Sequence, residues 1–288
     1  MKRVILFGAS GNAGKMIAAE LRKRNYELTA VVRSQKKAEE LKHITTSFII
    51  AEATNPQALK GICNGFDIVI SSLGKSVSPN DKSKPSFREI DFSVNERVLR
   101  EALNAGVKKF VYLSVFYADK YPDLEYFKTH HDFEESLKRS GIDYSIVRPP
   151  AIFCSFVDLM DMAKKGRLIT MGKGDKRTNP IYEGDLAKVV VDSIGEHKAL
   201  IEAGGKEILS RKQINEIIQN GIAPGKKVRT VPMGLIKSSL PVIRVFSRNM
   251  YDKMAFFAAV MQHDPIAPRV GEMRLEEYVK MKAPSVRD

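Results

Sequence analysis

The stretch GASGNAG, residues 8–14, follows the apolar run RVILF (3–7) and precedes an alanine-rich pattern that predicts a helix over about 12–24. Its glycines stand in the order G-x-x-G-x-x-G, at Gly8, Gly11 and Gly14. Glycine permits a tight turn, which lets backbone N–H groups approach a ligand closely, and the N-terminus of a helix favours negative charge. Between a strand and a helix, such a loop is typical of sites that bind the pyrophosphate of a dinucleotide.

Strand-like and helical patterns alternate six times in the first half of the chain. The apolar runs are short and rich in Val and Ile, and they lie at 3–7, 28–33, 47–50, 67–71, 108–114 and 143–149. Between them, amphipathic patterns predict long helices over about 87–105 and 126–140, the second ended by Gly141. Such an alternation predicts a parallel sheet covered by helices on both faces.

We therefore expect an α/β protein with a Rossmann domain over residues 1–150. A smaller, mixed and mainly helical C-terminal substrate region is expected over 151–288, interwoven with the first domain. There, TNPIYEGDLA (178–187) predicts a strand that leads into a helix, KEILS and KVRTVP predict short strands, and about 233–282 is expected to be helical.

Charge and cysteine usage limit the classes of partner. Lys and Arg exceed Asp and Glu by 13, which favours anionic partners: phosphorylated cofactors, acidic small-molecule substrates, nucleic acid or a membrane surface. The basic residues are scattered, with no RNA-binding aromatic signature and no zinc-finger spacing, so nucleic acid is not an expected partner. No apolar run is long enough to predict an integral membrane segment. Cys63 and Cys154 lie in no paired motif, and we expect a cytoplasmic protein.

The end of the second predicted strand indicates which dinucleotide is bound. NAD binders usually have an acidic residue there, which holds the ribose hydroxyls. This chain has Arg33, followed by Ser34, Lys36 and Lys37. A carboxylate would repel a 2′-phosphate, whereas a guanidinium pairs with it through two hydrogen bonds. The sequence therefore predicts NADP as the cofactor, with a merely solvated strand-end arginine as the alternative.

Several motifs in register make residues 1–220 resemble the short-chain dehydrogenase/reductase superfamily. They are GASGNAG, VVR, DIVISSLG, FVYLS, SGIDYSIVRPP and the later NPIYEGDLA. More narrowly, the chain resembles the atypical branch that includes NmrA-like and other NAD(P)H-binding proteins. That resemblance implies cofactor phosphates on the glycine loop, at Gly8, Ser10, Gly11, Asn12, Ala13 and Gly14. It also implies adenine near Glu52 and Ala53, contacts along the cofactor from Ser72, Leu73 and Gly74, and a nicotinamide flanked by Pro149, Pro150 and Ala151.

The resemblance also implies a catalytic set. In catalytic members a serine ends the fifth strand, and a Tyr-x-x-x-Lys motif on the next helix handles the substrate proton while a hydride moves. Here Ser114 ends the fifth predicted strand, and YFKTH places Tyr126 and His130 on one helix face, with histidine in the lysine position. A histidine relays a proton or donates to a ribose hydroxyl. Ser114, Tyr126 and His130 are therefore the predicted catalytic residues, and His130 is also expected near the cofactor ribose. The alternative for Tyr126 is a packing role without catalysis. Tyr117 is a second candidate for the tyrosine.

Other polar residues receive structural interpretations. His130 with Glu134, or His131 with Glu135, share helical faces, but no third ligand is evident, so no metal site is predicted. Asp185 is expected to cap its helix and Cys154 to be a small buried side chain.

The C-terminal helical region leaves three interpretations open. Helical spacing connects Met250, Met254, Phe257 and Met261. They form a core or homodimer stripe, or a lid for an apolar substrate, or, with Arg244, Arg248 and Lys253, a helix on a membrane surface.

Three functions follow. The first is an oxidoreductase, an NADPH-dependent reductase of a small carbonyl, enone or quinone. The second is a non-catalytic, NmrA-like NADP-binding regulator. It is favoured by the presence of His130 where the catalytic motif has a lysine. The third is a nucleotide-sugar epimerase or dehydratase, against which stand Arg33, the absent Tyr-x-x-x-Lys motif and the short interval between Ser114 and Tyr126.

Overall fold

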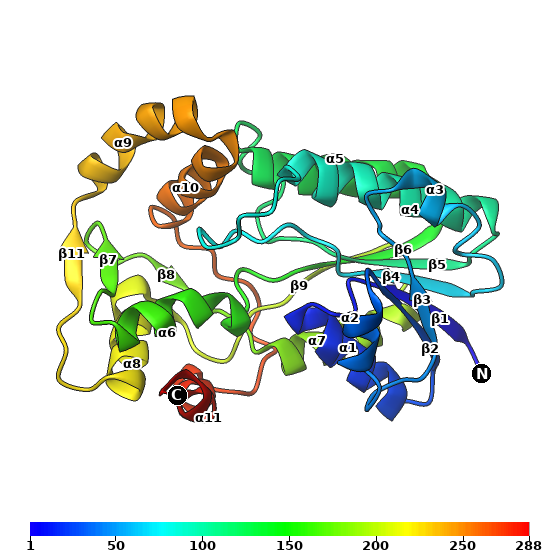
Figure 1. Cartoon of the computed structure of the whole chain (residues 1–288), viewed down its shortest axis with the longest axis horizontal. Coiled ribbons are helices and arrows are strands. Elements are labelled where there is room, and N and C mark those ends of the chain that lie inside the picture. The colour runs from blue at the N-terminus through cyan, green and yellow to red at the C-terminus, as the bar shows by residue number, and fades with distance from the viewer. Residues whose placement is uncertain (288) are drawn as a thin grey trace. The chain divides into compact units, whose positions relative to one another are not determined.

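The computed structural model describes residues 1–287, and contacts divide the chain into two compact units (Figure 1). The first unit contains Met1–Lys75, Pro85–Arg148 and Leu186–Ile201. The second contains Ser76–Lys84, Pro149–Asp185 and the chain from Glu202 onward. Each unit is therefore assembled from segments that are distant in sequence.

The first unit is built on a seven-stranded sheet with the order β3-β2-β1-β4-β5-β6-β9. Its strands are β1 (Arg3–Phe7), β2 (Glu27–Val32), β3 (Phe48–Ile50), β4 (Ile68–Ser71), β5 (Lys109–Leu113), β6 (Asp143–Arg148) and β9 (Ala199–Glu202). The pairs from β3 to β6 are parallel, for example Ile5 opposite Val69 between β1 and β4. This is the strand order of a Rossmann fold, so the predicted doubly wound α/β class is confirmed. The edge strand β9 was not predicted.

Helices lie on both faces of this sheet. They are α1 (Asn12–Lys23), α2 (Gln35–Glu39), α3 (Pro56–Leu59), α4 (Asn95–Asn104), α5 (Glu125–Arg139) and α7 (Glu183–Asp192), with a 3-10 turn at Ser193–Gly195. In Figure 1, α1 covers one face while α4 and α5 cover the other. Fully buried side chains such as Phe110, Tyr112 and Phe133 fill the layer between the sheet and α5. Burial of these aromatic side chains fixes α5 over the strands.

The helix predicted over 87–105 differs from expectation in its first half. Residues Arg88–Val94 form a π-helical turn, η1, and the α-helix α4 begins only at Asn95. The side-chain amide of Asn95 donates to the carbonyl of Asp91 at 3.0 Å. An inserted side-chain donor supplies a hydrogen bond where the backbone spacing is widened, and π-turns are frequent at functional sites. Apolar periodicity alone does not distinguish the two helix types.

The second unit is mainly helical with two small sheets, one of β8 (Arg177–Thr178) and β10 (Leu209–Ser210), the other of β7 (Ile169–Met171) and β11 (Arg229–Val231). Its helices are η2 (Phe153–Phe156), α6 (Val157–Lys164), α8 (Arg211–Ile222), α9 (Met233–Phe246), α10 (Arg248–Val260) and α11 (Leu275–Arg287). Phe153, Met160, Ile218 and Tyr278 lie at the centre of its core. Among the described residues, no helix has the length and apolar character that crossing a bilayer demands.

The methionine stripe of α10 does not form the buried side of that helix. Met250, Met254, Phe257 and Met261 are half-buried, and the most buried charged side chain on α10 is that of Lys253. Lys253 Nζ donates at 2.7 Å to the carbonyl oxygens of Ser78 and Asp81, so it fastens the segment after β4 to α10. The interpretation of Lys253 as a membrane-facing cation is therefore wrong.

Candidate functional site

The glycine loop connects β1 to α1 by a turn that only glycine fits. Gly8 has a φ of +77°, and a Cβ there would lie 2.7 Å from the carbonyl carbon of Ser72. A Cβ on Gly14 would overlap the carbonyl oxygen of Gly8 and lie 2.9 Å from the Cα of Ala9. The N–H of Gly11 donates to the Gly8 carbonyl at 3.0 Å, which closes the turn.

The start of α1 is suited to an anion. The N-cap Gly11 has no side chain, and the first turn carries no acidic residue. The amides of Asn12, Ala13 and Gly14 precede the first helical hydrogen bond, which Lys15 donates to Gly11. Because such amides have no acceptor within a helix, they are available to a phosphate at the end of β1.

The end of β2 is followed by two exposed cations, Arg33 and Lys36. Arg33 is exposed directly after β2, and the hydroxyl of Ser34 caps α2 by accepting from the amide of Lys37. Lys37 pairs with Glu40 at 2.8 Å. Within residues 1–287, neither Arg33 nor Lys36 has a carboxylate at ion-pair distance. An unpaired guanidinium at this strand end provides the partner that a 2′-phosphate requires.

The segment after β4 is held from two sides. The amide and hydroxyl of Ser72 both donate to the Phe7 carbonyl, at 3.1 and 3.0 Å. The amide of Lys75 donates to Asp91 Oδ1 at 2.6 Å. These bonds fix Ser72, Leu73 and Gly74 between the end of β1 and the π-helical turn.

Asp91 was missed in the sequence, although an acid within the apolar pattern of 87–105 was a usable signal. Its side chain is fully buried, and its Oδ2 has no hydrogen-bond partner among the described residues. Burial raises the pKa of Asp91 well above the usual range.

The remaining predicted cofactor residues have simpler surroundings. The Glu52 carboxylate accepts from the Thr54 hydroxyl at 3.1 Å, and Ala53 packs on the core of the first unit. Pro149, Pro150 and Ala151 follow β6 and belong to the second unit.

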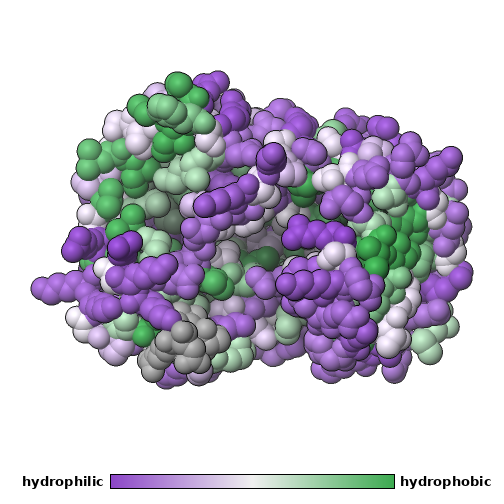
Figure 2. All heavy atoms as spheres, viewed as in Figure 1, coloured by the Kyte–Doolittle hydropathy of each residue, from purple (hydrophilic) through white to green (hydrophobic). Residues whose placement is uncertain are grey.

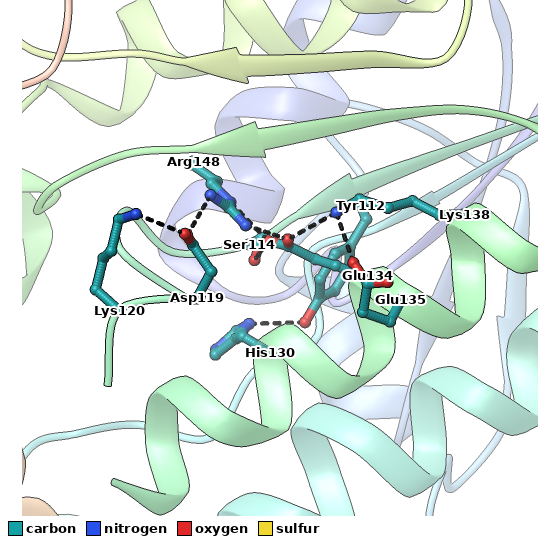
Figure 3. A network of polar contacts seen from close by, with 9 residues as sticks. All are labelled: Tyr112, Ser114, Asp119, Lys120, His130, Glu134, Glu135, Lys138 and Arg148. Carbon is teal, nitrogen blue, oxygen red and sulfur yellow. Dashed lines mark hydrogen bonds and ion pairs between the residues drawn. The ribbon is translucent and has the colours of Figure 1, made fainter. Parts of the chain in front are cut away.

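Tyr126 and His130 lie together on α5. Their ring centroids are 4.9 Å apart in an edge-to-face arrangement, and Tyr126 also packs on Phe87 at 5.3 Å. His130 Nδ1 lies 2.7 Å from the hydroxyl of Tyr112, which projects from β5 (Figure 3). Tyr117, the second tyrosine candidate, stacks on Phe116 with a positive φ of 67°.

The titration of this pair differs from that of a Tyr-x-x-x-Lys motif. Burial, followed by the charge of Arg148, lowers the pKa of His130 to about 3, so the imidazole is neutral at pH 7. Burial, followed by Asp91, raises the pKa of Tyr126 above its ordinary value. Where a lysine would lower the tyrosine pKa, this site keeps Tyr126 a protonated hydrogen-bond donor.

Acid should therefore destabilise the protein through His130. The folded state binds this proton only below about pH 3, whereas the unfolded chain binds it below about pH 6.5. The contribution is complete above pH 6.5 and is lost as the pH falls toward 3, by up to about 1.4 kcal/mol per pH unit. We expect urea unfolding of His130→Gln to show a shallower slope of stability against pH than wild type. His197→Gln, at a mostly exposed position, is the control, and equal slopes for wild type and His130→Gln would refute the expectation.

Ser114 belongs to a buried ionic network. Its hydroxyl donates to Glu134 Oε1 at 2.5 Å, and the same oxygen accepts from Arg148 Nε at 2.9 Å. The other Glu134 oxygen pairs with Arg148 Nη2, and Arg148 Nη1 donates to Asp119 at 2.8 Å (Figure 3). Glu134 is fully buried and Arg148 almost so. The Ser114 hydroxyl is thus directed to Glu134.

The sequence interpretation missed this network because it considered Glu134 only as half of a metal-type pair. In the part of the chain that the structure describes, no group of three or more His, Cys, Asp or Glu is placed to hold a metal. Asp185 lies in the first turn of α7 instead of capping it, and its Oδ2 accepts from the amides of Glu272 and Met273. Cys154 is half-buried instead of buried.

These features agree with a comparison of the whole chain with protein families. Residues 8–197 match the NAD(P)H-binding family model. The chain belongs to this NAD(P)H-binding family. The resemblance to the atypical short-chain dehydrogenase/reductase branch is thereby confirmed at the level of family and fold.

Relatives of known name include enzymes and an assembly factor. Over 253 residues the chain is 29% identical to the chloroplastic divinyl chlorophyllide a 8-vinyl-reductase of Arabidopsis thaliana, covering 81% of this chain and 56% of that protein. It is 20% identical to the photosystem II assembly factor Ycf39 of Synechocystis, covering 88% and 78%. The NADPH-dependent quinone oxidoreductase QOR2 of Escherichia coli, solved with NADPH, has a TM-score of 0.72 at 19% identity over 96% of this chain and 99% of that one, which shows a shared fold.

Proposed function

We propose that this protein is an NADPH-dependent reductase of a small quinone, enone or carbonyl compound. The observation that carries the proposal is Arg33, exposed at the end of β2 without a carboxylate partner among residues 1–287. With Lys36 it offers two positive charges to a 2′-phosphate, where an NAD site would have an acid. NADPH, when bound, supplies the hydride.

The cofactor seat in this proposal uses backbone groups first. The amides of Asn12, Ala13 and Gly14 would hold the phosphates, with Ser10 beside them. Glu52 and Ala53 would border the adenine, and Ser72 to Gly74 would line the cofactor along its length. His130 is proposed near the nicotinamide ribose, and Pro149 to Ala151 near the nicotinamide itself.

The state of the polar residues favours quinones and enones within the proposed substrate class. The Ser114 hydroxyl donates to Glu134, His130 is neutral, and the pKa of Tyr126 is raised. We propose that Tyr126 orients a substrate oxygen as a hydrogen-bond donor, with Ser114 and His130 as positioning residues. A simple ketone becomes a strongly basic alkoxide, so its reduction depends on a general acid that transfers a proton with the hydride, and a tyrosine with a raised pKa is a weaker general acid. The anion of a reduced quinone or enone is delocalised and takes its proton from water.

A second candidate is a non-catalytic NADP-binding regulator. It is supported by the same internal hydrogen bonds of Ser114 and His130, since neither group is directed to a substrate by those bonds. The similarity to a protein named as an assembly factor fits this alternative. An epimerase or dehydratase is the least favoured, because the end of β2 has Arg33 in place of an acid.

The state of the two cysteines bears on the location of the protein. Neither Cys63 nor Cys154 forms a disulfide among the described residues, which suits a reducing compartment, and we propose the cytoplasm. The plant relative is named as a chloroplast protein, so immunolocalisation in the source cell would test this directly.

Replacing Arg33 with alanine should weaken NADPH binding by about 10- to 100-fold, the worth of charge-assisted hydrogen bonds to one phosphate. NADH binding should be nearly unchanged, because NADH lacks that phosphate. Calorimetric titration is the measurement, since the chain has no tryptophan to report by fluorescence. In NADPH oxidation with a short-chain quinone, KM for NADPH should rise while kcat is retained. Arg139→Ala, at an exposed position on α5, is the matched control.

Two results would decide against the proposal. Equal affinity of the wild type for NADH and NADPH, or unchanged NADPH affinity in Arg33→Ala, would refute the cofactor assignment. Tight NADPH binding without oxidation by quinones, enones or carbonyl compounds would favour the regulator.

A further inference from the structure

Helix α9 exposes a cluster of large apolar side chains. Val245 and Phe246 are 83% and 84% exposed, and Leu235 and Val242 are 63% and 59% exposed. Leu235 and Val242 are two helical turns apart, and Val245 and Phe246 follow one turn later, so the four side chains share one face. Figure 2 shows hydrophobic residues gathered where Figure 1 places α9. Single exposed apolar residues are normal, but such a cluster indicates an interaction surface.

This outer face is not needed for packing inside the second unit. The inner face of α9 is formed by Ile236, which is buried, and by Leu240 and Ile243, which are half-buried. The helix is therefore apolar on two sides, and only the inner side has partners in its own unit. The outer face is therefore exposed apolar surface that a partner outside the chain can cover.

The charge around α9 indicates what kind of partner this is. Residues 217–251 contain no Asp or Glu, but they contain six basic residues: Lys226, Lys227, Arg229, Lys237, Arg244 and Arg248. Lys237 and Arg244 are two turns apart on α9 and exposed, about a quarter of a turn around the helix from Val245, and neither has a carboxylate partner within the described residues. The Arg244 guanidinium lies over the ring of Tyr251 at 5.4 Å. Arg248 pairs with Asp252 at 3.0 Å, so the uncompensated positive charge on α9 is that of Lys237 and Arg244, on one side of the exposed apolar face.

We infer that α9 binds peripherally to an anionic lipid bilayer. Val242, Val245 and Phe246 would enter the boundary between headgroups and acyl chains, while Lys237 and Arg244 would contact anionic headgroups. A bilayer needs only an exposed apolar stripe with flanking cations, which is what α9 presents. A second copy fits less well, because a two-fold contact through α9 would bring like charges together without an acid nearby.

The inference goes beyond the proposed reductase and does not depend on it. It concerns α9 alone, whereas the proposed cofactor residues lie mainly in the first unit. A membrane-bound protein would meet apolar substrates, such as quinones, where they dissolve. Loss of membrane binding and loss of cofactor binding can therefore be measured separately.

The test is flotation of the full chain with vesicles. Recovery with vesicles of phosphatidylcholine and phosphatidylglycerol in equal amounts should be high at low salt, and it should fall with added salt and with phosphatidylcholine alone. The double variant Val245→Ser/Phe246→Ser should reduce the partition coefficient by about tenfold or more. The control Leu103→Ser/Leu200→Ser changes two exposed apolar residues in the first unit and should bind as wild type does.

A second pair of variants tests the charges. Lys237→Gln/Arg244→Gln should reduce binding to the anionic vesicles by about tenfold. Lys60→Gln/Lys108→Gln removes the same net charge from exposed positions elsewhere and should have a much smaller effect. All four variants should have the circular dichroism spectrum and the thermal unfolding midpoint of the wild type, which shows that they are folded.

Three outcomes would overturn the inference. The wild type fails to float with anionic vesicles at low salt, or Val245→Ser/Phe246→Ser floats as well as the wild type. In the third outcome, sedimentation shows a dimer that Val245→Ser/Phe246→Ser dissociates while vesicles bind neither protein, in which case a second copy covers α9.

Discussion

Replacing Gly14 with alanine is expected to abolish NADPH binding. The new Cβ would overlap the carbonyl oxygen of Gly8 and lie 2.9 Å from the Cα of Ala9. Both neighbours are backbone atoms of the turn that leaves β1, so the overlap is relieved only if α1 moves away from the sheet. Such overpacking costs about 1–3 kcal/mol of stability. The same movement displaces the amides of residues 12–14, on which the proposed phosphate site depends.

Calorimetric titration with NADPH and scanning calorimetry of the free protein check this expectation. Gly195→Ala is the matched control, because a Cβ there meets no atom within 4 Å and its φ is not positive. We expect the control to bind as wild type does. If Gly14→Ala binds NADPH with the affinity of the wild type, the phosphates lie elsewhere and the proposed cofactor seat is wrong.

Most of the first unit was predictable because its signals are local. The runs of Val and Ile in β1, β2 and β4 to β6 appear in the sequence within one or two residues of the observed strands. Strand β9 was missed because its four residues are half-buried or exposed at the sheet edge, and such a strand lacks a continuous apolar run. The π-helical turn was missed because it depends on where the Asn95 side chain bonds.

In the candidate site, too, the local features were predictable from the sequence and the long-range contacts were not. Helical spacing predicted that Tyr126 and His130 share a face, and their rings are in contact. The hydrogen-bond partners of α5 residues at the site come from the strands. Tyr112 on β5 bonds to His130, and Arg148 on β6 bonds to Glu134. Parallel strands bring these residues together only after the sheet has formed, so no local pattern reveals the pairing.

The ion pair of Glu134 and Arg148 should dominate the stability of this region. Glu134→Leu is expected to lower the free energy of unfolding by about 3–5 kcal/mol, because it leaves a buried guanidinium with Asp119 as its remaining partner. It also removes the acceptor of the Ser114 hydroxyl. Urea unfolding at neutral pH gives the value directly.

Two companion variants distinguish burial from simple loss of a charge pair. Asp132→Ala, on the same helix, breaks a part-exposed ion pair with Arg88 at 2.8 Å and should cost less than about 1 kcal/mol. The double variant Glu134→Leu/Arg148→Met should regain most of the lost stability, because no unpaired charge is then buried.

The same double variant connects the network to the candidate site. Since the charge of Arg148 helps to lower the pKa of His130, its removal should raise the pKa of that imidazole, which NMR titration would detect. In the contrary result, Glu134→Leu lowers the free energy of unfolding no more than Asp132→Ala does. That result would mean that water reaches Arg148, so the low-dielectric surroundings that keep His130 neutral and Tyr126 protonated would be absent. The preference for quinone and enone substrates rests on that setting, so it would fail with it.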